Sequence, residues 1–300
     1  MKIRLNYAKI LFPALIALGG CASGKFDAPA LEEKLTEYAN GKDCRIGIAV
    51  IYEGDTISVN GSERFPMLSV YKFPQAIAVG RLLEEQESFP DDSVYISESE
   101  ILRDTYSPMR ERYGVTSMRL PIGELMQYSL VVSDNNACDI LFRLIGGPAV
   151  ADSVVRSLGF HNISLVNTEA EMNENPELCY SNSATPVGIA SLMDAFYDSI
   201  SDSGVWIHNI KVNLEMCSTG VNRIPGANFE PETLIGHKTG TGPVNAEGRI
   251  IAINDVGYIE LPCGRSYTLA VLVSDSPYSR EETEGMIGEI SEIVRAEIAQ

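Results

Sequence analysis

Ser-Val-Tyr-Lys at residues 69–72 is the stretch that decides how this chain folds, because it joins a loop to a buried helix. The loop covers residues 64–68, and apolar side chains at residues 76–83 recur with the spacing of a helix packed in a core. This pattern predicts Ser69 at the helix start, with the Lys72 amine beside its hydroxyl, since residues three apart share a helix face. Burial favours a neutral amine, so Lys72 is expected to accept the Ser69 proton. Backbone amides at the helix start would stabilise an oxyanion formed when the serine attacks a carbonyl.

The composition describes a folded chain with a strongly acidic charge. Its 300 residues are 45% hydrophobic, enough for one compact domain or two closely packed lobes. The formal net charge is −18. Such an acidic body repels phosphate backbones, so nucleic acid is not an expected partner.

The N-terminus has the pattern of an export signal. Three basic residues precede or adjoin the apolar run at residues 10–18, which is too short to span a bilayer as a helix. Residues 1–20 are therefore predicted to be a signal peptide that directs the protein to the periplasm. Leu-Gly-Gly-Cys at residues 18–21 resembles a bacterial lipobox, in which the cysteine is lipidated and becomes the mature N-terminus. We expect a lipid on Cys21 and a membrane tether at residues 21–28; the alternative is ordinary cleavage nearby, with Cys21 incidental.

The remaining cysteines and the histidines do not have the spacing of metal ligands. They are Cys44, Cys138, Cys179, Cys217, Cys263, His161, His208 and His237. No Cys-x-x-Cys occurs, so neither a hydrolytic zinc site nor any other metal or cofactor is expected. Export permits disulfides, but the sequence does not assign pairs, and buried free thiols are expected for several of the cysteines.

Strand signals lie near both ends of the chain and helical signals lie between them. Helical spacing occurs at residues 31–39, and β-branched runs at residues 45–52 and 56–60 predict a hairpin. From about residue 66 to 220, helices are predicted at residues 76–85, 121–131, 137–145, 149–158, 186–200 and 206–217. Strands are then predicted at residues 234–239, 249–254, 257–261 and 267–275, and a last helix at residues 280–299.

This order of elements predicts an α+β fold. One antiparallel sheet is built from both chain ends and flanked by helices, and an all-helical lobe is inserted in it. We assign about residues 29–65 and 221–300 to the α/β lobe, and about residues 66–220 to the helical lobe, of a single domain at residues 29–300. A cleft is expected at the lobe boundary, where Ser69 lies at the first crossing.

Three further motifs carry groups that bind ligands or transfer protons. Ser-Asp-Asn at residues 133–135 lies between two predicted helices, and Lys-Thr-Gly-Thr-Gly at residues 238–242 lies on a late strand, where glycine lets a ligand approach. Glu169 to Asn173 falls in a polar segment, residues 167–183, with the character of an Ω loop. Singly, these motifs are a helix cap, a strand end and a solvated loop acid. Their joint occurrence in this order favours one catalytic site.

The four motifs in this order resemble the signatures of the class A serine β-lactamases. The resemblance covers about residues 29–300, and Glu-x-x-Met-Asn at residues 169–173 is similar to the family's Glu-x-x-Leu-Asn. Three features resemble the branch of the family found in Bacteroides-like anaerobes: Phe65-Pro66 before Ser69, Tyr106-Ser107-Pro108, and His237 before Lys238. The resemblance implies a monomer that hydrolyses the amide of small-molecule β-lactam antibiotics through a serine acyl-enzyme.

The resemblance implies catalytic roles for four side chains. Ser69 would open the lactam and become acylated. Lys72 would take part in proton transfer from Ser69, although the family's acylation base is disputed between this lysine and the loop glutamate acting through water. Ser133 would pass a proton to the departing lactam nitrogen. Glu169, with Asn173, would position and activate the water that hydrolyses the acyl-enzyme.

Other positions would bind the substrate. The amides of Ser69 and Thr241 would form the oxyanion hole, and Asp134 would be a structural support. Asn135 would bond the substrate's side-chain amide, and Tyr106 would form a wall of the cleft. The lysine and the two threonines of the last motif would hold the substrate carboxylate by charge-assisted bonds. The full substrate-binding set is Tyr106, Asn135, Asn173, Lys238, Thr239, Gly240 and Thr241.

The sequence departs from the family where an arginine often supports the carboxylate site. Residues 245–249 do not align cleanly with that position, which leaves Arg223 or another arginine to supply the charge. Leu68 and Gly242 exclude the disulfide that lies beside the nucleophile in the family's carbapenemases. Thr241 is compatible with cephalosporin turnover, which the resemblance to the anaerobe branch also favours.

Two other functions share part of this pattern. A penicillin-binding DD-peptidase has the acylating serine and lysine but lacks a loop with Glu169 and Asn173, so it deacylates lactams slowly. A β-lactam-sensing domain is acylated without turnover and needs a membrane-spanning transducer, and the sequence has no such span beyond its signal.

Overall fold

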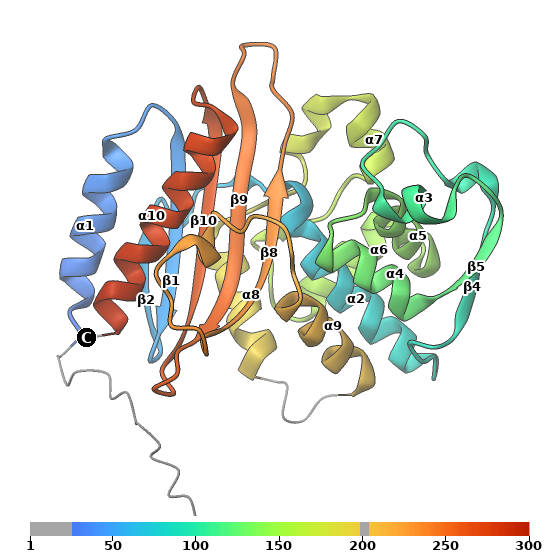
Figure 1. Ribbon diagram of the computed structural model, residues 1–300, viewed down its shortest axis with the longest axis horizontal. Helices are drawn as coiled ribbons and strands as arrows, with labels where there is room; N and C mark the ends of the chain where they lie inside the picture. Colours follow the sequence, from blue (N-terminus) through green and yellow to red (C-terminus); the bar gives the residue numbers. More distant parts are fainter. Residues whose placement is uncertain (1–25, 199–203, 300) are drawn as a thin grey trace, which may run out of the picture.

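The two ends of the chain meet in one antiparallel sheet, as Figure 1 shows for the computed structural model. The structure describes residues 26–198 and 204–299. Among these residues the main sheet has the strand order β2-β1-β10-β9-β8, and each neighbouring pair is antiparallel. The strands are β1 (Arg45–Tyr52), β2 (Asp55–Val59), β8 (Leu234–Thr241), β9 (Ile250–Glu260) and β10 (Ser266–Ser276). The predicted α+β class, with a sheet from both chain ends, is confirmed.

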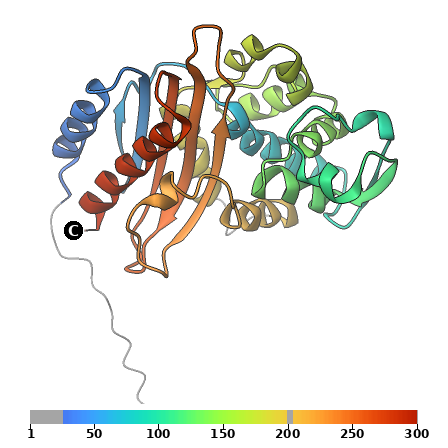
Figure 2. The same cartoon turned by 45° about the horizontal axis from the view of Figure 1, so that its top comes forward.

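Helices cover both faces of this sheet, which is why β1 and β10 are buried along most of their length. α1 (Ala28–Asn40) and α10 (Arg280–Ile298) lie on one face, and α8 (Pro186–Asp198) packs on the other (Figure 2). Successive side chains of β1 point to opposite faces, so Ile48 joins the hydrophobic core beneath α1 and α10, whereas Ala49 joins the core that contains α8. The sheet therefore separates the two cores.

β9 corrects one prediction. The sequence predicts two strands, at residues 249–254 and 257–261, but β9 is one strand paired with β8 and β10 along its length. Asp255 does not break the strand, because its buried carboxylate is bonded to His237 on the neighbouring strand. Gly257 lies opposite His237, whose Cβ would be only 2.9 Å from a Cβ at position 257. Asp255 and Gly257 are residue types that are typical of turns, but here contacts with His237 across the sheet explain their place within a strand.

The middle of the chain forms the predicted helices. They are α2 (Lys72–Glu85), α4 (Ile122–Val131), α5 (Asn135–Ile145), α6 (Pro148–Ser157), α8 and α9 (Val205–Glu215), with the shorter α3 (Pro108–Tyr113) and α7 (Glu169–Glu174) in addition. α5 shows how local sequence sets their ends. Asp134 caps its N-terminus by accepting the Ala137 amide, and Gly146, with φ of 93°, ends it in the left-handed region that favours glycine.

The prediction that residues 66–220 are all helical is wrong in detail. β4 (Ser93–Ile96) pairs with β5 (Met118–Pro121), and β3 (Phe65–Pro66) and β6 (Ile163–Ser164) both pair with β7 (Ser183–Ala184). These strands have two to four residues, too few for a repeating sequence pattern, so only their tertiary partners define them. Short 3₁₀ helices complete the chain: η1 (Leu68–Tyr71), η2 (Glu98–Glu100), η3 (Pro176–Tyr180) and η5 (Ile224–Gly226).

The nucleophile stretch begins in a 3₁₀ turn. Ser69 lies in η1, and α2 begins three residues later at Lys72. Pro74 falls in the first turn of α2, where a backbone amide has no helical partner to lose. Asn254, buried in β9, holds the preceding loop by donating to the Pro66 carbonyl at 2.8 Å and the Met67 carbonyl at 2.9 Å. The sheet therefore fixes the start of the helix that carries Lys72.

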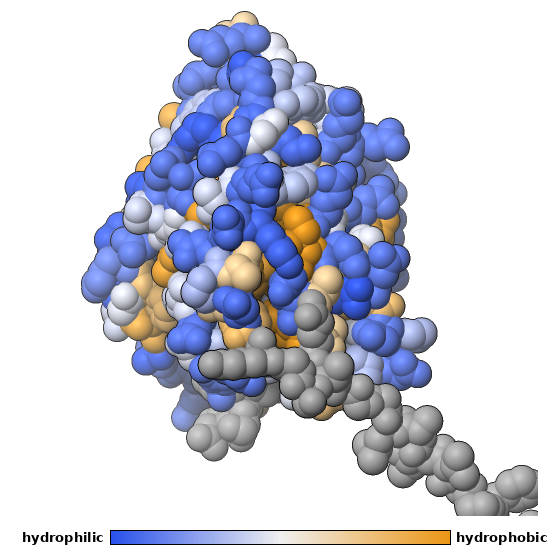
Figure 3. Space-filling view, turned by 90° about the vertical axis from the view of Figure 1, so that its left-hand side faces the viewer, coloured by the Kyte–Doolittle hydropathy of each residue, from blue (hydrophilic) through white to orange (hydrophobic). Residues whose placement is uncertain are grey.

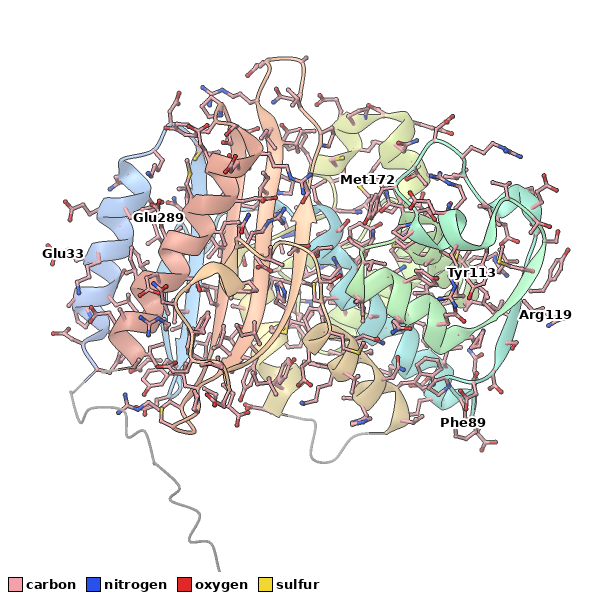
Figure 4. The ribbon with its side chains drawn as sticks, in the orientation of Figure 1. Glu33, Phe89, Tyr113, Arg119, Met172 and Glu289 are labelled. Carbon is pink, nitrogen blue, oxygen red and sulfur yellow. The ribbon has the colours of Figure 1, made fainter. Side chains whose placement is uncertain are left out.

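The surface beside α1 and α10 is largely hydrophilic, with hydrophobic side chains gathered in a narrow band (Figure 3). Glu33 and Glu289, labelled in Figure 4, lie on these two helices. The predicted signal peptide and Cys21 lie outside the described residues. Within those residues, we find no helix with the length and hydrophobicity needed to cross a membrane.

Candidate active site

A cleft of about 490 Å³ opens between η1, the helical part of the chain and β8. It contains most of the side chains that the sequence predicts for the site. The predicted residues that line it are Ser69, Tyr106, Ser133, Asn135, Glu169, Asn173, Thr239 and Thr241. The cleft is also lined by Thr219, Arg223 and Arg280, and the first two of these lie between α9 and β8 in the sequence.

The side chains predicted to be catalytic, Ser69, Lys72, Ser133 and Glu169, form one wall of the site, the catalytic wall. Glu169 lies at its centre. Its Oε1 atom accepts a hydrogen bond from the Ser69 hydroxyl at 3.4 Å and lies 3.0 Å from Lys72 Nζ. Residues from η1, α2 and α7, up to 100 positions apart, therefore meet at one carboxylate oxygen. This carboxylate is placed to receive a proton from the serine, or from a water between the two side chains.

The charge on Lys72 corrects the prediction of a neutral amine. Burial of this fully enclosed side chain lowers its pKa, but attraction to the Glu169 carboxylate outweighs burial, so the pKa is raised. The ammonium also donates to the Ser133 carbonyl at 2.8 Å and to Asn135 Oδ1 at 2.7 Å. Lys72 is thus a bound cation that orients its neighbours, and in this state it has no free lone pair for the Ser69 proton.

Ser133 lies between the two buried lysines. Lys238 Nζ donates to its hydroxyl at 3.0 Å, and Lys72 Nζ is 3.5 Å from the same oxygen. The backbone of Ser133 has φ of 60°, a left-handed conformation that is uncommon for serine and that directs its side chain into the cleft. Burial, with further contributions from Lys72 and Arg223, lowers the Lys238 pKa to about 8. A hydroxyl held by two amines is suited to relay a proton.

Asn135 and Asp134 have separate tasks in the same motif. Asn135 is the first residue of α5, and its side chain bonds Lys72 through Oδ1 and Thr105 through Nδ2 at 2.9 Å. Asp134 is fully buried and accepts bonds from the Met109 amide at 2.7 Å and the Ser107 hydroxyl at 2.9 Å. It therefore joins α3 to α5 and lies outside the cleft lining, as expected for a structural support.

Tyr106 stands at the mouth of the cleft. Its side chain is 56% exposed, so it offers a hydrophobic surface to anything that enters. The backbone of Tyr106 accepts a hydrogen bond from the Asn135 amide at 3.1 Å. The predicted wall position is therefore occupied by an aromatic ring next to Asn135.

The wall formed by β8 carries the groups that the sequence predicts to bind the substrate carboxylate. Arg223 is buried and donates to Thr241 Oγ1 at 2.6 Å, to the Gly240 carbonyl at 2.9 Å and to Glu284 at 2.9 Å. Its Nε atom has no hydrogen-bond partner among the described residues. Arg249 instead bonds the Asp275 carbonyl at 2.8 Å, outside the cleft lining. Of the arginines that remained open from the sequence, Arg223 is the one that contacts the Lys-Thr-Gly strand.

Gly240 brings β8 close to the nucleophile. A Cβ atom at this position would lie 2.3 Å from the Met67 carbonyl and 3.2 Å from the Val70 amide, so a side chain there would push the strand away from η1. Close packing of β8 on η1 brings Thr241 into the same cleft as Ser69. Glycine at position 240 is therefore explained by the approach of the two backbones.

The segment that carries Glu169 is held by Asp139 of α5, which the sequence analysis missed. Its carboxylate accepts the amides of Glu169 at 2.8 Å and Ala170 at 2.9 Å, at the start of α7. Burial raises the pKa of Asp139 to about 7, and the nearby Glu169 carboxylate adds to this effect. An acid in an otherwise hydrophobic stretch of α5, residues 137–142, is the signal that could have revealed it.

Met172 and Asn173 are consecutive residues of α7, and both line the cleft. Met172, labelled in Figure 4, is 5% exposed and accepts a weak bond from the buried Asn182 amide, so methionine fills the leucine position of the family motif. Asn173 is exposed and lines the cleft. The polar segment predicted as an Ω loop thus contains a short helix, capped by Thr168 and Glu171.

The described residues contain no group of three or more histidine, cysteine or acidic side chains that could hold a metal ion. The groups that the cleft brings together are a hydroxyl, a carboxylate and ammonium groups. A serine with a carboxylate on one side and a cationic strand on the other is suited to acyl transfer from an anionic amide.

Helical and sheet lobes with this cleft between them define a class A β-lactamase fold. A solved class A β-lactamase from Bacteroides cellulosilyticus superposes with a TM-score of 0.87 at 28% identity, over 92% of this chain and 99% of that one. The TLA-1 extended-spectrum β-lactamase superposes with a TM-score of 0.87 at 33% identity, over 91% of this chain and 99% of that one.

The chain belongs to the β-lactamase enzyme family, whose model matches residues 30–298. A β-lactamase from Bacteroides uniformis is 34% identical over 95% of this chain and 98% of its own length. The extended-spectrum β-lactamase PER-1 from Pseudomonas aeruginosa is 31% identical over 88% of this chain and 86% of its own length. The predicted relationship to the Bacteroides branch is confirmed, and the protein is an enzyme that hydrolyses β-lactams.

Proposed function

We propose that this enzyme opens β-lactams by forming an ester at Ser69, which is then cleared by water that Glu169 deprotonates. The observation that carries the proposal is the contact of Glu169 Oε1 with both Ser69 Oγ, at 3.4 Å, and Lys72 Nζ, at 3.0 Å. One carboxylate is within reach of the nucleophile and of the volume where the ester would be attacked. The ion pair with Lys72 holds that carboxylate in position.

Acylation uses the groups around Ser69. The hydroxyl attacks the lactam carbonyl and loses its proton towards Glu169, the acceptor that the geometry favours over a charged Lys72. The amides of Ser69 and Thr241 stabilise the oxyanion. Ser133 gives its proton to the departing nitrogen and regains one from its amine partners, of which Lys238, with a pKa of about 8, is the readier donor near neutral pH.

Substrate orientation uses the opposite wall. The ammonium of Lys238 and the hydroxyls of Thr239 and Thr241 bind the carboxylate of the substrate, with Arg223 behind them. Asn135 bonds the side-chain amide of the substrate, and Tyr106 packs against it. Deacylation then requires water held by Glu169 and Asn173. A penicillin-binding peptidase is the weaker alternative, because the segment around Glu169 is built into this cleft by Asp139.

The direct test is hydrolysis of a chromogenic cephalosporin. We expect steady turnover by the wild type and a loss on the order of 10⁶-fold in kcat for Ser69→Ala. Ser129 offers a matched control, because it is a buried serine of α4 whose hydroxyl has no partner among the described residues. Ser129→Ala should keep wild-type turnover. Turnover by Ser69→Ala within tenfold of wild type would refute the nucleophile.

The substrate range is proposed to favour cephalosporins, on the basis of the Thr241 hydroxyl and the relatives from Bacteroides. A panel of a penicillin, a cephalosporin and a carbapenem tests this. The highest kcat/KM is expected for the cephalosporin. A higher value for the penicillin would contradict the preference and would leave the serine mechanism intact.

We also propose that residues 29–300 work as one catalytic domain in the periplasm, anchored by a lipid at Cys21. The support is the basic and apolar leader followed by the lipobox-like residues 18–21. Fractionation of cells tests the anchor: Cys21→Ala should move activity from the membrane to the soluble fraction. Equal membrane association of the variant and the wild type would contradict lipidation.

A further inference from the structure

A cysteine that the lactam chemistry does not use lies behind the carboxylate-binding wall. Cys217 follows α9, and its Sγ atom is 3.4 Å from Thr219 Oγ1. Thr219 Oγ1 lies in turn 2.6 Å from Thr239 Oγ1. Both threonines line the cleft. Thr219 therefore links the thiol to Thr239, which belongs to the site proposed for the substrate carboxylate.

The thiol is part of a cysteine–histidine–aspartate arrangement. His237 Nδ1 lies 2.9 Å and 3.0 Å from the two carboxylate oxygens of Asp255, and Cys217 lies close enough to His237 for each side chain to shift the pKa of the other. His237 and Asp255 are both buried, so the ring is fixed between a carboxylate and a thiol. A base held by a third group next to a nucleophile is the geometry that activates thiols in enzymes.

The charges around this cluster favour the thiolate. Burial alone would raise the pKa of Cys217, but His237, then Lys238 and the Thr219 hydroxyl, outweigh burial and lower it to about 7. Burial likewise opposes protonation of His237, yet Asp255 and Cys217 raise its pKa to about 10. A thiolate paired with an imidazolium is therefore populated at neutral pH.

The other free cysteines lack these neighbours. Cys138 and Cys179 are buried, and burial raises the pKa of both thiols. Cys44 is partly exposed, as Cys217 is, but burial and the adjacent Asp43 raise its pKa to about 11. Cys44 is thus a matched control for exposure without activation.

We propose that Cys217 is a site of thiol–disulfide exchange, at which a small disulfide in the surroundings of the enzyme attaches one of its halves and blocks the adjacent lactam site. The inhibitory part of this proposal rests on the proposed function, whereas the reactivity of the thiol does not. It requires only the contacts of Cys217 with His237 and Thr219.

The exchange is chemically balanced. The Cys217 thiolate attacks one sulfur of a disulfide R–S–S–R, a bond forms between the two sulfurs, and the second R–S⁻ leaves and takes a proton from solvent. The small disulfide is the oxidant. The added R–S group is attached 3.4 Å from Thr219 Oγ1, so we expect it to disturb the Thr219–Thr239 contact and to obstruct the adjacent end of the cleft, which is proposed to bind the substrate carboxylate.

The test uses oxidised glutathione with the full chain, and peptide mass mapping to follow each cysteine. At pH 7.5 we expect Cys217 to be modified at least about tenfold faster than Cys44, because its larger thiolate fraction outweighs its lower intrinsic nucleophilicity. Hydrolysis of the cephalosporin should fall in step with the modification and return on addition of dithiothreitol. Cys217→Ser should retain activity under the same treatment, and Cys44→Ser should lose it as the wild type does.

Two results would overturn the inference. One is modification of Cys217 no faster than that of Cys44. The other is unchanged kcat/KM in protein fully modified at Cys217. His237→Gln gives an independent test of the role of the histidine. Loss of the imidazolium should move the pH midpoint of the Cys217 labelling rate upward from about 7. Labelling is read by mass, so a failure of the lactamase assignment would leave the reactivity result interpretable.

Discussion

The two walls of the cleft each contain a fully buried lysine, yet the two lysines have opposite pKa shifts. Lys72 faces the Glu169 carboxylate at 3.0 Å, which raises its pKa against the effect of burial. Lys238 has no carboxylate at that range among its described contacts, and burial lowers its pKa to about 8. Both amines are fully buried, so the difference comes from the carboxylate beside Lys72, which reverses the effect of burial there.

This difference divides the work of the site. On the catalytic wall, the positive charge of Lys72 is paired with the Glu169 carboxylate. On the wall formed by β8, Thr239, Thr241 and Arg223 line the cleft, and the buried Lys238 amine lies directly behind, bonded to the Thr239 carbonyl and the Ser133 hydroxyl. These donors are suited to bind an anion. In the proposed mechanism, catalysis and anion binding are therefore assigned to different walls of the cleft.

Replacing each lysine by methionine should have the largest effect and should separate the two walls. Lys72→Met leaves Glu169 without its cation, and we expect kcat to fall by about 10³-fold. Lys238→Met removes one charge-assisted bond to the substrate, and we expect kcat/KM to fall by about 10²-fold, mainly through KM. Steady-state kinetics on a cephalosporin measure both. If both variants lost activity through kcat and KM in the same proportion, the two walls would not have separate roles.

Removing the support of Glu169 should have the next largest effect. Asp139→Ala leaves two backbone amides of α7 without their acceptor, so Glu169 loses its position, and kcat should fall by about 10²-fold with little change in KM. Asp152→Ala is the matched control, because Asp152 accepts the Leu165 amide at 2.9 Å but contacts neither α7 nor the cleft. A loss in the control as large as that in Asp139→Ala would reduce the role of Asp139 to general stability.

The pH dependence of binding should show the smallest effect and the clearest sign. The charged form of Lys238 is proposed to bind the substrate carboxylate, and this form is lost as pH rises through about 8. We therefore expect kcat/KM to fall by up to about tenfold per pH unit above pH 8. Because the Lys72 pKa is raised, Lys72 stays charged over the same range and can supply the Ser133 proton in place of Lys238, so kcat should fall less steeply than kcat/KM. Parallel pH profiles of kcat and kcat/KM would contradict the assignment.

The sequence predicts well what depends on local pattern and poorly what depends on distant partners. Ser69, Ser133, Glu169 and Lys238 come from motifs in a fixed order, and the structure brings them around one cleft. The charge of Lys72 was predicted wrongly, because the carboxylate that decides it is 97 positions away. The residues near Lys72 in the sequence, including Ser69, do not predict the contact of Lys72 with Glu169.

The same reason explains the remaining errors. In the sequence, Asp139 looks like an ordinary acidic residue of a helix, because its partner, the Glu169 amide, is 30 positions away. Asp255 reads as a break in β9 until His237 is placed opposite on β8. Cys217 reads as an ordinary thiol until the same histidine is seen beside it. In each case a polar group in an apolar stretch is the signal, and the partner that gives it meaning comes from another element.

The most direct test of the account is the mass of Glu169→Ala after brief mixing with a cephalosporin. If Glu169 drives the water that clears the ester, the variant should become fully and persistently acylated on the peptide that contains Ser69, while the wild type shows no lasting adduct. Turnover by the variant within about tenfold of the wild-type rate, without any adduct, would contradict the account.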